Sequence, residues 1–314
     1  MARNVKISTI GGPYHKLDES LPYGVMWDKM QEHLAKQIDQ VLPDKPDLIV
    51  LTEVCDLPAY LPEAHMGPFV DYRKEDNVRF FGRIAKENNC NISFSTVSRG
   101  NGDYYLNTMY VLDRAGGIAG AYHKNFVTYR EDDWNIRYGT EAPLIQLDFG
   151  KAACAICFDL NFDELMERYK ALKPDLIIFA SMYHGGLQQQ MWANMCRAYF
   201  VGAIAHQRPS SILSPLGEVI AYSTDYLNFA TGVINLDYAF VHLNDLSQML
   251  ELKKAYGTGV KIYDPCHIGY FMLTSELPDV SVGEMMKQYN IMPYDEYLDY
   301  SRGRRDKPDK QVCG

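Results

Sequence analysis

The sequence lacks the features that place a chain in a membrane, on a secretory route or on nucleic acid. No apolar run reaches the eighteen or so residues of a membrane-spanning helix, and residues 1–6 enter a strand pattern without the apolar core of a signal peptide. The formal net charge is −9, and the only basic cluster, residues 302–305, reads as a solvated tail. We therefore expect a cytoplasmic protein that binds neither membrane nor nucleic acid.

Cysteines are few, odd in number and scattered, which is typical of reduced thiols and argues against a disulfide framework. Cys154 and Cys157 form one C-x-x-C pair, but no second pair and no spaced pair of histidines completes a metal site. Residues three apart on a strand point to opposite faces, so we expect Cys154 in the core and Cys157 outside it.

Strands and helices alternate along the 314 residues, which favours an α/β fold with a large core. The apolar pattern predicts strands over 5–10, 47–53, 91–97, 108–113, 118–124, 144–148, 152–157, 175–179 and 231–236, and helices over 23–42, 76–88, 161–172 and 188–201. Residues 58–68 read as a proline-rich loop. The pattern changes after residue 238, so we predict a domain over 1–238 and a C-terminal extension over 239–314. The extension is rich in Tyr and Met, includes a helix over 282–289, and is expected to cover the domain or a neighbouring subunit.

An acid, an amine and a thiol each stand where an apolar run ends: Glu53, Lys124 and Cys157. Open α/β folds gather their chemistry at strand ends. A helix beginning at residue 158 would place its positive end near the thiol and favour the thiolate. Each residue also has a structural reading: a buried small apolar side chain for Cys157, a helix cap for Glu53 and an edge charge for Lys124. Asp159 and Asn161 fit helix N-caps.

These residues and the segments around them resemble the nitrilase superfamily of carbon-nitrogen hydrolases. The matching fragments run in order along residues 4–238: Glu53, Lys124, Arg130-Glu131, the Gly150-Lys151 turn, Cys157, then Trp192 with Arg197-Ala198 and Ser214-Pro-Leu-Gly217. The ordered combination is specific because independent chance matches would have to fall in sequence at strand ends. Trp192 and Arg197 are expected to pack and brace.

The resemblance implies a four-layer αββα sandwich of two stacked mixed sheets, assembled as a homodimer or higher homo-oligomer. It implies that Cys157 attacks the substrate, Glu53 transfers protons, and Lys124 with the backbone N–H of Phe158 stabilises the oxyanion. It requires no cofactor and no metal. A second glutamate would orient Lys124, and both Glu131 and Glu141 are candidates.

Substrate identity is left open by the sequence. Phe158 and the segment 161–163 stand where many members have Tyr and an Arg-Phe-Pro turn, and the paired arginines that hold a carboxylate are missing. We therefore expect a neutral or aromatic-lined pocket, with wall residues among Tyr60, Phe126, Trp134, Tyr183 and His184.

The predicted function is thiol-dependent hydrolysis of a small non-peptide amide or carbamoyl compound. A nitrilase is the alternative within the same chemistry, and a catalytically silent binding subunit is the alternative from another class. A metal-dependent phosphoesterase of the DNase-I-like type is disfavoured because its terminal Asp-His signature is absent and the charge is acidic.

Overall fold

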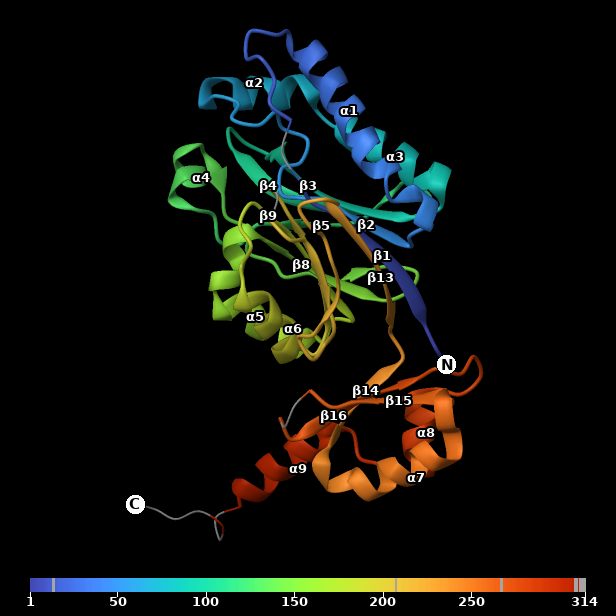
Figure 1. Ribbon diagram of the computed structural model, residues 1–314. Helices are drawn as coiled ribbons and strands as arrows, with labels where there is room; N and C mark the ends of the chain where they lie inside the picture. Colours follow the sequence, from blue (N-terminus) through green and yellow to red (C-terminus); the bar gives the residue numbers. More distant parts are fainter. Residues whose placement is uncertain (13–14, 207, 266–267, 308–309, 311–314) are drawn as a thin grey trace. The chain divides into compact units, whose positions relative to one another are not determined.

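A computed structural model describes residues 1–12, 15–206, 208–265, 268–307 and 310 (Figure 1). Its contacts divide the chain into two compact units. The larger unit is Val5–Ile234, and the smaller unit combines Met1–Asn4 with Asn235–Gly314.

The larger unit contains two mixed β-sheets. The first has the strand order β13-β1-β2-β3-β4-β5, with β6 beside β4, and the second has the order β12-β11-β10-β9-β8-β7. The strands of the first sheet are β1 Asn4–Ile10, β2 Leu48–Val50, β3 Asn91–Arg99, β4 Tyr105–Leu112, β5 Ile118–His123, β6 Ile136–Arg137 and β13 Phe229–Asn235. Those of the second are β7 Ile145–Gln146, β8 Lys151–Ile156, β9 Leu176–Ser181, β10 Tyr199–Ile204, β11 Ser211–Leu213 and β12 Val219–Tyr222.

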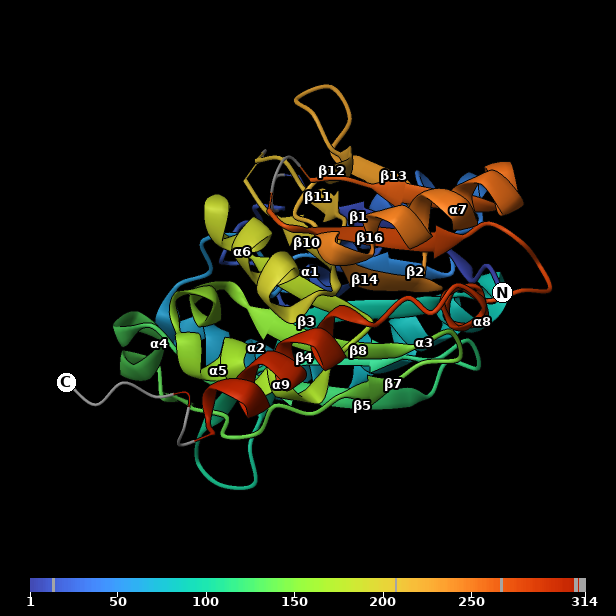
Figure 2. The ribbon, with the colours of Figure 1, turned by 90° about the horizontal axis from the view of Figure 1, so that it is seen from below.

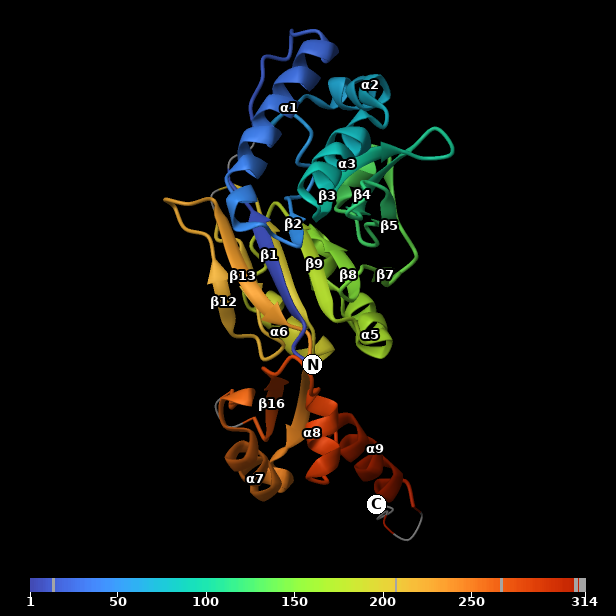
Figure 3. The same ribbon diagram turned by 90° about the vertical axis from the view of Figure 1, so that its right-hand side faces the viewer.

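Helices cover the outer face of each sheet, which confirms the predicted αββα sandwich (Figures 1 and 3). On the first sheet lie α1 Tyr23–Asp39, α2 Glu63–Arg73 and α3 Asp76–Asn88, and on the second lie α5 Asp163–Leu172 and α6 Leu187–Cys196. A short helix, α4 Tyr129–Asp133, follows β5. The buried face of α1 carries Met26, Met30, Leu34 and Ile38, all of which lie in the core.

Two predicted elements are wrong. The helix expected over 188–201 ends at Cys196, Arg197 adopts a left-handed φ of 51°, and Tyr199–Ile204 forms the buried strand β10. The proline-rich loop contains α2, which has Pro68 inside it and buries Met66, Phe69 and Val70. In both places tertiary burial decides the element, because a short apolar run fits either a buried strand or a helix.

The smaller unit has its own sheet, with the order β14-β16-β15, and its own core. Its elements are β14 Tyr238–His242, α7 Leu246–Tyr256, β15 Val260–Tyr263, β16 Tyr270–Ser275, α8 Val282–Gln288 and α9 Tyr294–Arg305 (Figure 2). Met249, Met285 and Met286 are buried in that core, and His242 stacks on Tyr297 with ring centroids 3.9 Å apart. Much of the Tyr and Met content of this segment is therefore accounted for within the unit.

No helix in the described residues is long and apolar enough to cross a membrane. Within the same ranges Cys55, Cys90, Cys154, Cys157 and Cys196 are all free thiols.

Candidate active site

Three strand ends of the larger unit meet at one small cavity. Glu53 follows β2, Lys124 follows β5 and Cys157 follows β8, and all three line a cavity of about 200 Å³ together with Glu131. The remaining lining residues are Val54, Leu57, Met66, Val97, Asn107, Thr128, Arg130, Trp134, Ile136 and Met182. Most of this wall is apolar, which strengthens the electrostatic interactions of the few charged groups inside it.

The Glu53 carboxylate is buried and held at both oxygens. Oε1 accepts hydrogen bonds of 2.9 Å from the side-chain amide of Asn107 and of 2.9 Å from Lys124 Nζ. Oε2 accepts a hydrogen bond of 3.1 Å from the backbone N–H of Met182, just beyond β9 in the facing sheet. Both sheets therefore fix the orientation of this carboxylate.

Lys124 lies between two carboxylates. Its Nζ donates to Glu131 Oε1 at 2.9 Å and to Oε2 at 2.8 Å, in addition to its bond with Glu53. Burial of the ammonium opposes its charge, but the charges of Glu53 and Glu131 outweigh that effect and raise the pKa of Lys124. Burial alone would raise the pKa of the Glu131 carboxyl, but the Lys124 ammonium outweighs burial and lowers that pKa. Both ends of the pair are therefore charged at neutral pH.

The structure places Glu131, and not Glu141, against Lys124. Glu131 also caps helix α4, because its side chain accepts from the backbone N–H of Thr128 while the Thr128 hydroxyl accepts from the N–H of Glu131. The Glu141 side chain is exposed, and its backbone carbonyl accepts a hydrogen bond from Asn125.

The side chains of Glu53 and Ser181 lie close enough to the Cys157 thiol to affect its pKa. Burial, reinforced by the negative charge of Glu53, raises the pKa of this thiol to about 12. The expectation of a resting thiolate is therefore wrong. The expectation depended on the positive end of a helix that begins next to the thiol. Cys157 instead begins a short 3₁₀ turn, Cys157–Asn161, and α5 starts only at Asp163. The thiol keeps its proton until a base removes it, and Glu53 lies within reach.

Strained backbone flanks both groups. Cys157 has a φ of 48°, and Val54, directly after Glu53, has a φ of 41°. Such values are rare for a residue with a side chain and are most unfavourable for a β-branched one, at a cost of about 1–3 kcal/mol each. Strain of this kind concentrates where a side chain must be aimed.

Asn107 is a site residue that the sequence did not reveal. Its side-chain amide donates to Glu53 Oε1 and to Glu131 Oε1, both at 2.9 Å, so it bridges the two carboxylates. Its oxygen accepts from Ser95, whose hydroxyl in turn accepts from the backbone N–H of Val54. The signal that the sequence offered was a polar residue directly before the strand predicted over 108–113.

Asp159 is fully buried and ties the Cys157 turn to the segment that carries Lys124. Its carboxylate accepts from Ile156 N at 2.8 Å, from the Tyr122 hydroxyl at 2.7 Å and from Phe126 N at 2.9 Å. Burial raises the pKa of this carboxyl to about 6. Asp159 is not the N-cap of α5, which is Phe162; it caps the Cys157–Asn161 turn by accepting from the Ile156 N–H, and it also clamps that turn to the Lys124 segment. The Asn161 side chain donates to the carbonyl of Phe158 and to the Tyr183 hydroxyl.

Asp159→Asn should slow turnover by lowering kcat more than it changes KM. The amide nitrogen would face an N–H or hydroxyl donor, so at least one buried bond is lost at about 1–3 kcal/mol, and the thiol and the ammonium are no longer held at a fixed separation. Steady-state kinetics and thermal unfolding measure both effects. Asp163→Asn, at an exposed position on α5, is the matched control and should change neither. Equal kcat in the two variants would show that Asp159 does not position the site.

Of the expected wall residues, Trp134 lines the cavity and the other four do not. Tyr60 is 80% exposed, and Phe126 stacks on Phe162 with ring centroids 3.8 Å apart. The Tyr183 hydroxyl meets Asn161 and Gln188, and His184 accepts from the backbone of Gly186. The Phe158 ring packs edge-on against Phe162. Trp192 is buried and donates to the carbonyl of Leu160, which agrees with a packing role.

No group of three or more His, Cys, Asp or Glu side chains could hold a metal ion among the described residues. Cys154 is fully buried in β8, on the strand that leads to Cys157.

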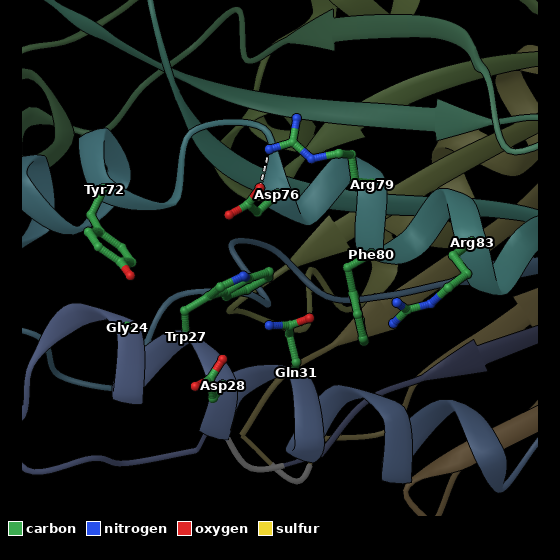
Figure 4. Close-up of a pocket in the computed structure, with 9 residues that line it drawn as sticks. All are labelled: Gly24, Trp27, Asp28, Gln31, Tyr72, Asp76, Arg79, Phe80 and Arg83. Carbon is green, nitrogen blue, oxygen red and sulfur yellow. Dashed lines mark hydrogen bonds and ion pairs between the residues drawn. The ribbon is translucent and has the colours of Figure 1, made fainter.

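A second hollow, of about 380 Å³, lies between α1, α2 and α3 (Figure 4). It is lined by Trp27, Phe80 and several charged side chains, including the paired Asp76 and Arg79, and contains no nucleophile beside a base.

Comparison with known proteins agrees with this geometry. The carbon-nitrogen hydrolase family model matches residues 24–235. Pantetheinase of Bos taurus is 26% identical over 141 residues, an alignment that covers 42% of this chain and 28% of the bovine protein. The chain thus matches little more than a quarter of the length of that curated relative.

Solved structures share the fold. A carbon-nitrogen hydrolase from Helicobacter pylori G27 has a TM-score of 0.63 at 17% identity, covering 81% of this chain and 93% of that protein. A mutant of the amidase from Nesterenkonia sp. AN1, with the acetamide moiety of fluoroacetamide added covalently at the active-site cysteine, has a TM-score of 0.61 at 12% identity. That match covers 74% of this chain and 90% of the amidase. With the family model spanning most of the larger unit, the chain belongs to the carbon-nitrogen hydrolase family of the nitrilase superfamily.

Proposed function

We propose that this carbon-nitrogen hydrolase cleaves a small non-peptide amide or carbamoyl compound through a covalent acyl-enzyme on Cys157. The observation that carries the proposal is one small cavity lined by a thiol and by a buried carboxylate that accepts a hydrogen bond from a buried ammonium. A nucleophile, a base and a cation are the three groups that acyl transfer requires.

In the first half of the reaction Glu53 takes the thiol proton as the sulfur of Cys157 attacks the carbonyl carbon. The negative charge moves to the carbonyl oxygen, where Lys124 and the backbone N–H of Phe158 stabilise it. When the tetrahedral intermediate collapses, the C–N bond breaks and Glu53 returns its proton to the departing ammonia or amine.

In the second half Glu53 removes a proton from water, and the hydroxide attacks the thioester carbon. The C–S bond then breaks, and the proton on Glu53 returns to the sulfur, which restores the resting enzyme. The bridge from Asn107 and the salt bridge from Lys124 to Glu131 keep Glu53 aimed at the thiol throughout.

Two relatives support this reading. One is a pantetheinase by name, and in the other, an amidase, the active-site cysteine carries a covalently added acetamide moiety. A nitrilase remains the alternative within the same chemistry, since a thiol can also add to a nitrile carbon. A silent binding subunit is less well supported, because the thiol, the carboxylate and the ammonium all line one cavity.

A screen for ammonia release over amides, ureido acids and nitriles tests the proposal. We expect release from amides or ureido acids that is insensitive to chelators and lost on thiol alkylation. Release from nitriles alone would favour the nitrilase, and no release from any class would favour the binding subunit.

For the assembly we propose a homodimer or a higher homo-oligomer in which residues 239–314 contribute to the contact between subunits. Light scattering at micromolar concentration should show at least two chains, and a chain shortened to residues 1–238 should lose assembly or thermal stability. A monomeric full-length chain would contradict this, as would a shortened chain that keeps both properties.

A further inference from the structure

The cavity contains one cation to which the mechanism gives no role. Arg130, the second residue of α4, lines the same cavity as Glu53, Lys124 and Cys157. Its guanidinium carbon lies 4.8 Å from the centre of the Trp134 ring, and Trp134 also lines the cavity. Arg130 is exposed whereas Lys124 is buried, so the guanidinium marks the solvent side of the cavity.

The two cations differ in their partners. Lys124 is bonded to both Glu53 and Glu131, and the Glu131 carboxylate is further occupied by Thr128. Within the described ranges the Arg130 guanidinium has the indole contact and neither an ion pair nor a hydrogen bond to any side chain. An indole holds a guanidinium in a fixed plane but satisfies none of its five N–H donors.

A planar guanidinium with free donors matches a carboxylate, which it binds through two parallel hydrogen bonds. The same cavity is also lined by apolar side chains, among them Leu57, Met66 and Ile136. A wall of this kind suits methylene groups, and a cavity of about 200 Å³ suits a small substrate. Both observations favour a short aliphatic spacer.

We propose that the substrate is a short aliphatic amide with a carboxylate at the end away from the scissile C–N bond, held by Arg130 against Trp134. This inference rests on the proposed function of the site. It also revises the neutral pocket expected from the missing arginine after Cys157, because α4 supplies an arginine from another segment.

The test compares kcat/KM for succinamate and glutaramate with that for butyramide and valeramide, in which a methyl group replaces the carboxylate. The wild-type enzyme should favour the acid of each pair. Arg130→Gln should lower that preference by about tenfold to a hundredfold, the range of a charge-assisted hydrogen bond. Arg137→Gln, at an exposed position of β6 that does not line the cavity, is the control and should leave the preference unchanged.

A second readout does not depend on turnover. Succinate should protect Cys157 from alkylation by iodoacetamide in the wild-type enzyme and much less in Arg130→Gln. A wild-type preference for the neutral amides would overturn the inference, as would an equal loss on both kinds of amide in Arg130→Gln. If no amide is hydrolysed but succinate protects Cys157 through Arg130, the proposed function fails while the carboxylate site stands.

Discussion

Cys157→Ala should abolish hydrolysis and leave the fold intact. Alanine removes the thiol that lines the cavity together with Glu53, so no covalent intermediate can form there. Cys157 is partly exposed at the end of β8 and carries a strained φ of 48°, and the smaller side chain does not open a hole in the core. Ammonia release and circular dichroism measure the two effects.

Cys154→Ala is the matched control. Cys154 is fully buried in β8, and burial raises the pKa of its thiol far above the ordinary range, so it is inert at neutral pH. Its loss should lower the unfolding free energy by about 1 kcal/mol and preserve turnover. If both variants lost activity equally with unchanged melting temperatures, the C-x-x-C pair would act together in redox or metal chemistry.

Lys124→Met should reduce turnover by at least about a hundredfold, the usual effect of losing one oxyanion donor. Binding should suffer less, because the charge is needed more in the transition state than in the ground state. Near-normal kcat in this variant would make Lys124 a structural residue only.

The same substitution should also destabilise the protein, because it leaves Glu53 and Glu131 buried without their cation. Removing one partner of a buried pair typically costs about 3–5 kcal/mol. The folded-state pKa of Glu131 is lowered, so its contribution is present above the ordinary pKa of 4.5 and is lost as the pH falls through the folded value. Thermal unfolding at pH 7 and at pH 3 should therefore show a smaller difference between variant and wild type at the acid pH. Glu131→Gln is the companion variant, since it removes one carboxylate and keeps the ammonium.

That Glu53, Lys124 and Cys157 would come together could be predicted from the sequence, because each one ends an apolar run. Glu53, Lys124 and Cys157 stand at strand ends, and strand ends of facing sheets meet in space. The sequence also repeats the segment Lys-Pro-Asp-Leu-Ile, at residues 45–49 and again at 173–177. The strands formed there, β2 and β9, lie in different sheets, and Lys45 and Lys173 both adopt left-handed φ values near 50°.

The supporting residues could not be predicted, since their roles depend on tertiary contacts. Asn107 looks like an ordinary strand residue until two carboxylates from other segments reach it. Asp159 resembled a helix cap because its partners Tyr122 and Phe126 are more than thirty positions away, as the separations of 37 and 33 show. The prediction of the pocket's wall residues was mostly wrong for the same reason, since only Trp134 of the five lines the cavity.

Mass mapping of the enzyme during turnover tests the central claim most directly. The enzyme is mixed with the best amide from the screen, quenched rapidly in acid, digested and mapped by mass spectrometry. The account predicts an adduct with the mass of the acyl part of the substrate on the peptide that contains Cys157, and no adduct in Cys157→Ala. Continued turnover without any adduct, or an adduct on another residue, would contradict it.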